Sequence, residues 1–322
     1  MIRTRLARAA RQTLFATTGL IGGAVLAWGV LQGAPAFAQT TAPAAATATA
    51  PAAAPAKPAL WVVRDADSTL YLFGTIHVLR PGTDWRTPEI QAAFDASSDV
   101  WMEIENPDDQ SAMMPLIQQH GLSLTRPLSS LLTAEEFTDL DAAARSIGAT
   151  GEQLNLLRPW LAALTLSVAP LAKAGYDPTS GVEMMLKAQA EAAGKSVHGL
   201  ETLEKQIGIL AGLPEAEQLI FLRSTLRDYD QAIEMTDGLV GAWAAGDVAA
   251  LDRVAVADMK ADSEVVYRAL LVDRNADWAG QIEGILAGSG TAFIAVGAAH
   301  LAGEDSVQAM LQAKGVTVER LQ

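Results

Sequence analysis

Two kinds of pattern divide the chain beyond residue 59, and their order constrains the fold more than any other feature. Short apolar runs that are typical of strands lie near both ends, at residues 60–63, 69–73, 99–105, 291–296 and 316–320. Between them, Ala- and Leu-rich sequence at residues 111–277 carries apolar residues at helical spacing, with a short strand-like break at 196–200. This order predicts an α/β (α+β) fold, in which a central mixed β-sheet is built from N- and C-terminal strands and a large helical middle region packs on it.

Several individual elements can be predicted from local chemistry. The first two apolar runs flank an Asp- and Ser-containing turn at 65–68, which indicates a β-hairpin. The run at 291–296 is apolar throughout, as expected for a strand covered on both faces. Pro88 is suited to begin a helix, and Thr133 with Glu136 forms a capping box.

The N-terminus has the pattern of a secretory signal peptide over residues 1–38. Four arginines precede a long uncharged and mainly apolar stretch, which ends in the small-x-small sequence Ala36-Phe37-Ala38. We therefore expect cleavage after Ala38 and a periplasmic or secreted protein with no stable membrane span. The alternative is an uncleaved N-terminal membrane anchor, because the apolar stretch approaches spanning length.

The composition of the rest of the chain narrows its class. Residues 39–58 are almost wholly Ala, Pro and Thr and predict a disordered linker, which leaves residues 59–322 as one large domain. The chain has no cysteine, so disulfides and thiolate metal sites are excluded. Its net charge of −14 becomes −18 without the four arginines, and a surface this acidic should repel nucleic acid.

Two of the four histidines follow apolar strands in the same local arrangement, Gly74-x-x-His77 and Gly297-x-x-His300. A strand end delivers the chain to the rim of a sheet, where sites in α/β proteins usually lie, and glycine permits a sharp turn there. Two imidazoles at one rim could bind a metal or move protons. A lone Gly-x-x-His is a weak motif, and a structural role for each histidine is the alternative.

Acidic residues at the end of the third predicted strand add to this arrangement. Strand alternation predicts Glu103 and Glu105 on one face, where burial without a cation would be costly. A divalent metal or an arginine would meet that need, and Arg274 is a candidate partner. Solvation of the strand end, and a surface position for Arg274, are the alternatives. His120, at an apparent helix end, and His198, in the short strand, are more typical of structural histidines.

These residues occur in a sequence that resembles the TraB/GumN family, which is related to the Tiki-type metalloproteases. The resemblance runs from about residue 60 to 321 and includes both Gly-x-x-His motifs and the acidic strand. Further markers are Leu60-Trp61, Gly181-Val182-Glu183, Gly199-Leu200-Glu201-Thr202, Gln206, Arg274-Asn275 and Trp278. Glu183 and Glu105 depart from the family's pattern, which has aspartate more often at these positions.

The resemblance implies a metal-dependent hydrolase, with peptide cleavage as the reaction of its Tiki relatives. Applied to this sequence, it assigns His77, Glu103 and His300 as ligands of a divalent metal ion, which manganese, cobalt or zinc would suit. Glu105 or Glu201 would be the catalytic base, and Arg274 an electrostatic clamp on the developing oxyanion.

Two functions of other classes stay open from the sequence. The protein could bind haem or a metal without catalysis, which absorbance near the Soret band after haem addition would test. It could also be an envelope interaction module, in which case both histidines are dispensable. The peptide or small-molecule substrate and the oligomeric state cannot be read from the sequence.

Overall fold

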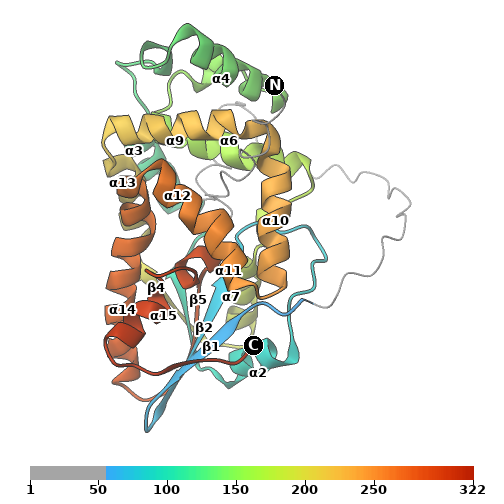
Figure 1. Cartoon of the computed structure of the whole chain (residues 1–322), viewed down its shortest axis with the longest axis vertical. Helices are drawn as coiled ribbons and strands as arrows, with labels where there is room; N and C mark the ends of the chain where they lie inside the picture. The colour runs from blue at the N-terminus through green and yellow to red at the C-terminus, as the bar shows by residue number, and fades with distance from the viewer. Residues whose placement is uncertain (1–55) are drawn as a thin grey trace, which may run out of the picture.

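A computed structural model describes residues 56–322, so the predicted signal peptide and nearly all of the predicted linker lie outside the described residues. The described chain forms one six-stranded sheet and many helices (Figure 1). The strands are β1 Leu60–Arg64, β2 Ser68–Thr75, β3 Asp99–Ile104, β4 Ser196–Glu201, β5 Gly290–Gly297 and β6 Val318–Arg320. The α/β fold class and the strand–helix–strand order predicted from the sequence are confirmed.

The helices fall into three groups along the chain. Before β4 come α2 Pro88–Ala96, α3 Gln110–Gly121, α4 Ala134–Ser146, α5 Gly151–Leu154, α6 Pro159–Lys173 and α7 Val182–Ala192. Between β4 and β5 come α8 Leu203–Gly212, α9 Glu215–Arg227, α10 Ala232–Ala244, α11 Val248–Leu251, α12 Ala257–Asp262, α13 Glu264–Tyr267 and α14 Asp273–Leu286. After β5 comes α15 Val307–Ala313. Two π-helical turns, η4 Asp252–Val256 and η5 Arg268–Val272, and short 3₁₀ turns, among them η6 Ala298–Leu301, connect these helices.

The strand order β4-β3-β5-β2-β1-β6 places the N-terminal and C-terminal strands next to one another in the sheet. The C-terminal strand β5 lies between β3 and β2 and runs parallel to both, while β4 runs parallel to β3. The predicted hairpin is confirmed as the antiparallel pair β1–β2, and β6 adds antiparallel to β1. Four neighbouring strands therefore end at the same edge of the sheet, called here the carboxyl edge.

Both faces of the sheet are covered, as the apolar run of β5 predicted. Trp278 and Ile282 of α14 and Leu311 of α15 pack with one face of β5, through residues such as Ile294. The opposite face contributes Phe293 and its neighbours to a larger core with α2, α7 and the helical middle region. Alternate β5 side chains thus enter different cores, and both are apolar.

The helical middle region covers the carboxyl edge. In Figure 1, α6 and α9 cross above the sheet, α14 runs along one side, and α4 lies farthest away. Helix α6 is buried on nearly every side rather than along one face, because it lies between α9 and the other helices of the middle region. The predicted capping box of Thr133 is present at the start of α4.

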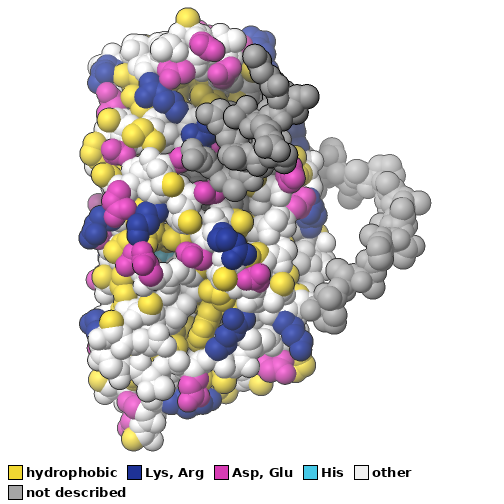
Figure 2. All heavy atoms as spheres, in the orientation of Figure 1, with side chains coloured by type: hydrophobic (Ala, Val, Ile, Leu, Met, Phe, Trp, Pro, Cys, Tyr) yellow, Lys and Arg dark blue, Asp and Glu magenta, His cyan; other side chains and the backbone are white. Residues whose placement is uncertain are grey.

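Figure 2 shows acidic and basic side chains interspersed over the face in view, with histidine visible only at a small spot. Among the described residues, no helix has both the length and the apolar character needed to cross a membrane.

Candidate functional site

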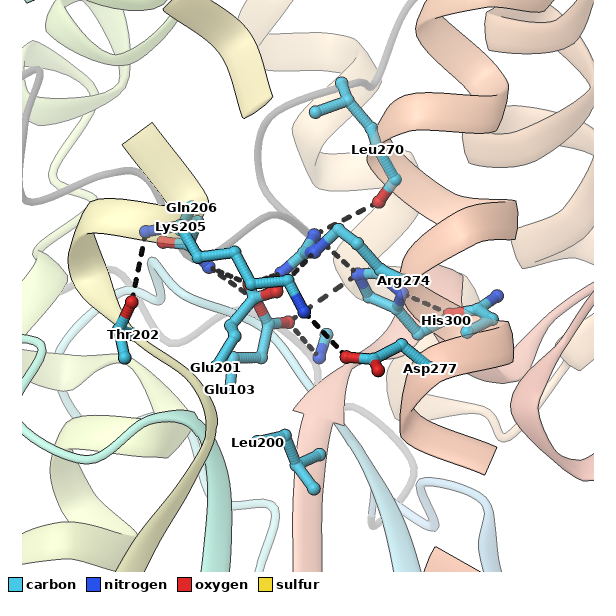
Figure 3. A network of polar contacts seen from close by, with 12 residues as sticks. Glu103, Leu200, Glu201, Thr202, Lys205, Gln206, Leu270, Arg274, Asp277 and His300 are labelled. Carbon is cyan, nitrogen blue, oxygen red and sulfur yellow. Dashed lines mark hydrogen bonds and ion pairs between the residues drawn. The ribbon is translucent and has the colours of Figure 1, made fainter. Parts of the chain in front are cut away.

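The predicted polar residues meet where the parallel strands end. His77 follows β2, Glu103 lies one residue before the end of β3, Glu201 ends β4 and His300 lies in η6 just after β5. Arg274 reaches the same place from the first turn of α14. These five side chains, with Glu183, Gln206 and Asn275, form what is called here the buried polar cluster, part of which is drawn in Figure 3.

Glu103 brings the two histidine motifs together. Its Oε1 lies 4.0 Å from Nε2 of His77 and 3.7 Å from Nε2 of His300. The same oxygen accepts the backbone N–H of Gly297 at 2.8 Å, which ties β3 to the glycine of the second motif. The two Gly-x-x-His turns, distant in sequence, thus face one carboxylate, as the sequence predicted.

His77 is oriented by a carboxylate that the sequence assignment omitted. Its Nδ1 lies 2.7 Å from Oε1 of Glu183, in the first turn of α7, and that oxygen also accepts the hydroxyl of Thr75. With Nδ1 engaged in this way, Nε2 is the ring nitrogen that faces Glu103. The side chains of His77 and Glu183 are 8% and 9% exposed, against 3% for Glu103, so these two residues lie nearest the surface of the protein.

Gly181 permits the close approach behind this contact. A Cβ at this position would lie 2.2 Å from the carbonyl oxygen of His77, a distance that no side chain tolerates. The backbone N–H of Val182 donates to the carbonyl of Ile76 at 2.9 Å. The start of α7 is therefore held directly against the turn that carries His77, which places Glu183 within reach of the imidazole.

Arg274 is the centre of the cluster, and all five of its N–H donors have protein acceptors (Figure 3). Nε and Nη2 donate to the two oxygens of Glu201, and Nη2 also donates to Glu103 Oε2 at 2.7 Å. Nη1 donates to the carbonyl of Leu270 and to Nε2 of His300, each at 3.1 Å. The predicted oxyanion clamp would have to give up one of these contacts, so in this arrangement Arg274 positions its neighbours.

The tautomer of His300 follows from its neighbours. The amide nitrogen of Asn275 donates to the carbonyl of Asp305 at 2.8 Å, which directs the amide oxygen at His300 Nδ1, 2.5 Å away. Nδ1 therefore carries the proton, and Nε2 accepts from Arg274. The ring is fully buried and packs on Trp278, with ring centroids 4.4 Å apart.

Burial and charge set the ionisation of this cluster. Burial and the Arg274 charge together lower the pKa of His300 to about 3, so the imidazole is neutral. Burial alone would raise the pKa of Glu103, but the Arg274 charge, with a contribution from the Gly297 N–H, outweighs it and lowers the pKa to about 2. Burial raises the pKa of Glu201 despite the opposing effect of Arg274.

Gln206 links the two acids that flank Arg274. Its amide nitrogen donates to Glu103 Oε2 at 3.1 Å and to Glu201 Oε1 at 3.0 Å, which fixes the orientation of the amide. Gln206 Oε1 and Glu183 Oε2 are buried acceptors for which the described residues supply no donor. A ligand that carries N–H or O–H groups would satisfy such atoms.

The predicted metal ligands converge, but their present contacts do not fit an ion at His300. Two ligands of one ion with bonds of about 2.0–2.2 Å lie ~3.0–4.2 Å apart, a range that includes both histidine–Glu103 separations. However, the Nε2 lone pair of His300 is used by Arg274, and a metal needs that lone pair. Over residues 56–322, no group of three or more His, Asp and Glu side chains is arranged to hold a metal ion.

The remaining predicted residues lie outside the cluster. Glu105 is exposed and follows the end of β3, so the strand alternation that was expected to align it with Glu103 does not extend to it. His120 is in the last turn of α3, as expected for a histidine near a helix end. His198 is half-buried, lies 3.0 Å from Asp99 and stacks on Trp101.

Glu183, Gln206 and Asn275 are cluster residues to which the sequence assigned no role. All three stood among the markers of the family resemblance, and Glu183 follows Gly181 at a helix start. Those features could have drawn attention to them, but not to the atoms they contact.

Comparisons with known proteins identify a family and several relatives of this chain. The sequence model of the TraB/PrgY/gumN family matches residues 59–320. An uncharacterized protein of Treponema pallidum (strain Nichols) is 22% identical over 263 residues, which cover 77% of this chain and 78% of that protein. The uncharacterized protein YbaP of Escherichia coli (strain K12) is 24% identical over 192 residues, covering 60% and 70% respectively. No solved structure matches the chain.

Proposed function

The chain belongs to the TraB/PrgY/gumN family, and from this premise we propose that it is a hydrolase of acyl bonds, peptide bonds among them. The observation that carries the proposal is the pair His77–Glu183 beside the ionised Glu103. The pair has the form of a base oriented by a carboxylate, since Nδ1 contacts Glu183 at 2.7 Å and Nε2 faces Glu103 Oε1 at 4.0 Å.

In the proposed reaction, one water hydrogen bonds to both His77 Nε2 and Glu103 Oε1, a separation that a single water spans. Nε2 takes a proton from this water, and its oxygen attacks the acyl carbon to form a tetrahedral intermediate. The protonated imidazole, stabilised by Glu183, returns the proton to the leaving nitrogen or oxygen as its bond to carbon breaks. Glu103 orients the water and stays ionised, as its low pKa requires.

His77 replaces Glu105 and Glu201 as the base in this proposal. Glu105 is exposed beyond the end of β3, and both oxygens of Glu201 accept hydrogen bonds from Arg274.

A metal-dependent form of the same hydrolysis is the second candidate. It is favoured by the separation of 4.0 Å between Glu103 Oε1 and His77 Nε2, which two ligands of one ion can have. Manganese, cobalt or zinc would suit the imidazole and carboxylate donors of His77 and Glu103. Activity that is lost after dialysis against a chelator, and restored by one of these ions, would favour this candidate.

His77→Ala tests the proposed base directly. We expect kcat/KM to fall by about 10²- to 10⁴-fold, because this is the usual contribution of general-base catalysis. The rate is measured by digestion of a peptide library followed by mass spectrometry, and on a panel of chromogenic esters. Glu183→Gln should lower the rate less, since it keeps the side-chain size while weakening the orientation of the imidazole.

The matched control is His198→Ala, which removes a half-exposed imidazole outside the cluster. It should leave the rate unchanged. If the wild-type protein hydrolyses these substrates and His77→Ala does so equally fast, His77 is not the base. Thermal unfolding of each variant separates loss of chemistry from loss of fold.

We also propose that the protein acts in the periplasm or outside the cell. The support is the arginine-rich start, the apolar stretch and the Ala36-Phe37-Ala38 sequence.

A further inference from the structure

The buried polar cluster brings together side chains of the kinds that bind metal ions, and a protein cation lies between them. Glu103, Glu201 and the Nε2 lone pair of His300 converge on one point from β3, β4 and η6. Two carboxylates and an imidazole are a common ligand set for zinc, manganese or cobalt. In this protein the guanidinium of Arg274 receives all three.

Every N–H donor of Arg274 has a protein acceptor. This would not be expected of a surface arginine whose side chain merely turned toward the protein interior. Its five N–H groups meet five acceptors from four different segments, and the side chain is 2% exposed. The donors of a guanidinium have a fixed planar geometry. All four segments must therefore be positioned correctly for their acceptors to meet these donors.

Two features of the backbone and packing hold the guanidinium at this point. The π-helical turn η5 ends just before Arg274, and the carbonyl of Leu270 within it accepts Nη1. Trp278, one turn further along α14, lies against the guanidinium, with its ring centroid 4.6 Å from Cζ. The same indole packs on His300, so one ring supports both the donor and the acceptor of that hydrogen bond.

A divalent ion at His300 would compete with this arrangement in two ways. It would need the His300 lone pair that accepts from Nη1 at 3.1 Å, and it would place a doubly charged cation within a few ångströms of the guanidinium in a buried environment. Asn275 keeps the proton on Nδ1, so the other ring nitrogen offers no alternative ligand.

We infer that the Arg274 guanidinium is the built-in cation of this site and excludes a divalent metal from His300. Glu103 and Glu201 then share a covalently attached cation rather than an exchangeable ion. This inference concerns metal binding and does not rest on the proposed hydrolysis.

Equilibrium dialysis of the whole protein with Co²⁺, with the bound cobalt measured by its visible absorbance, tests the inference. The wild-type protein and His300→Ala should bind cobalt equally, because His300 is not a ligand. Arg274→Ala removes the competing cation, and we expect it to gain a cobalt site. Adding His300→Ala to that variant should weaken the new site by at least ~10-fold, since even outer-sphere partners of metals contribute this much. Arg274→Lys keeps the charge and should gain no site.

The inference is overturned if wild-type protein binds cobalt and His300→Ala abolishes that binding. It is also overturned if Arg274→Ala folds and gains no cobalt site. Because Arg274→Ala leaves two carboxylates buried without their cation, it could fail to fold, and ¹⁵N NMR of the wild-type imidazoles provides a second measurement. With one equivalent of Zn²⁺, the unprotonated Nε2 resonance of His300 should stay unchanged, and a zinc-dependent shift of that resonance contradicts the inference.

Discussion

Arg274 and His300 show how single residues in this cluster set one another's charge. The guanidinium donates to the imidazole and to Glu103, so it favours a neutral ring and an ionised carboxylate at the same time. Both effects lower pKa values relative to the unfolded chain, and each one makes the folded state bind fewer protons in acid. The stability of the protein should therefore depend on pH through these two groups.

We expect the free energy of unfolding to fall on acidification in two stages. The pKa of His300 is lowered from 6.5 to about 3, so the unfolded chain binds the extra proton in this window and stability falls as the pH drops below 6.5. The pKa of Glu103 is lowered from 4.5 to about 2, which adds a second loss below pH 4.5. Because one pKa unit corresponds to about 1.4 kcal/mol, the total loss by pH 4 should be on the order of a few kcal/mol.

Urea unfolding at stepped pH values measures this dependence. His300→Gln keeps a hydrogen-bonding side chain but removes the titration, so its stability should change less between pH 6.5 and 4.5. His198→Gln is the matched control, because it removes an imidazole outside the cluster. An equal slope for wild-type protein and His300→Gln would show that His300 does not titrate on unfolding as we infer.

At the scale of residues, the sequence predicted which side chains lie near the site better than it predicted which of them contact one another. The Gly-x-x-His turns and Glu103 could be selected because strand ends of parallel strands share one edge of a sheet. Glu183 received no role, because its contact with His77 depends on how α7 packs against the end of β2. Glu105 was expected beside Glu103, but β3 ends at Ile104 and the alternation of strand side chains ends with it.

At the scale of elements, the start of α7 decides the orientation of His77. Gly181 precedes the helix, Val182 hydrogen bonds to the chain just before His77, and Glu183 contacts the ring. The negative carboxylate in the first turn is also favoured by the helix dipole. Gly181 thus lets α7 lie close enough to the turn after β2 for Glu183 to orient the imidazole of His77.

Gly181→Ala should move the start of α7 away from the turn after β2 that carries His77. The added Cβ would lie 2.2 Å from a backbone oxygen, so α7 has to move, at a cost of about 1–3 kcal/mol as for other overpacked sites. Hydrolytic activity should fall with it, because Glu183 moves away from His77. Urea unfolding and the peptide-library rate measure the two effects.

Gly208→Ala is the control for helix propensity. Gly208 lies inside α8, and a Cβ there meets nothing within 4 Å, so alanine should stabilise the protein by about 0.5–1 kcal/mol. If Gly181→Ala is as stable and as active as wild-type protein, the close approach of α7 is not what orients His77.

At the scale of the whole molecule, the residues ahead of the fold carry the predicted export signal. The family match begins at residue 59, and Lys57 and Pro58 already contact Ala244 and Gln322. The segment before them carries the predicted export signal, with cleavage expected after Ala38 because small residues occupy the cleavage positions.

We expect a bacterial host to deliver the protein to its periplasm with Gln39 as the first residue. The intact mass of the protein in the periplasmic fraction measures this directly. Ala38→Arg should block cleavage, whereas Ala44→Arg, placed beyond the cleavage site, should not. Recovery of the full-length mass from the membrane fraction would instead favour the N-terminal anchor.

The sequence by itself determined the strands at both ends, the helical middle region and the histidines that follow two of the strands. These depend on local chemistry, namely apolar periodicity, turn residues and helix caps, which act over a few neighbouring residues. Only the tertiary structure decided the order of the strands, the set of acceptors around Arg274 and the pairing of His77 with Glu183. They depend on contacts such as Arg274–Glu103 and His77–Glu183, which join segments 171 and 106 residues apart. Their geometry follows from how whole elements pack, because burial makes a charge costly unless its partners arrive together.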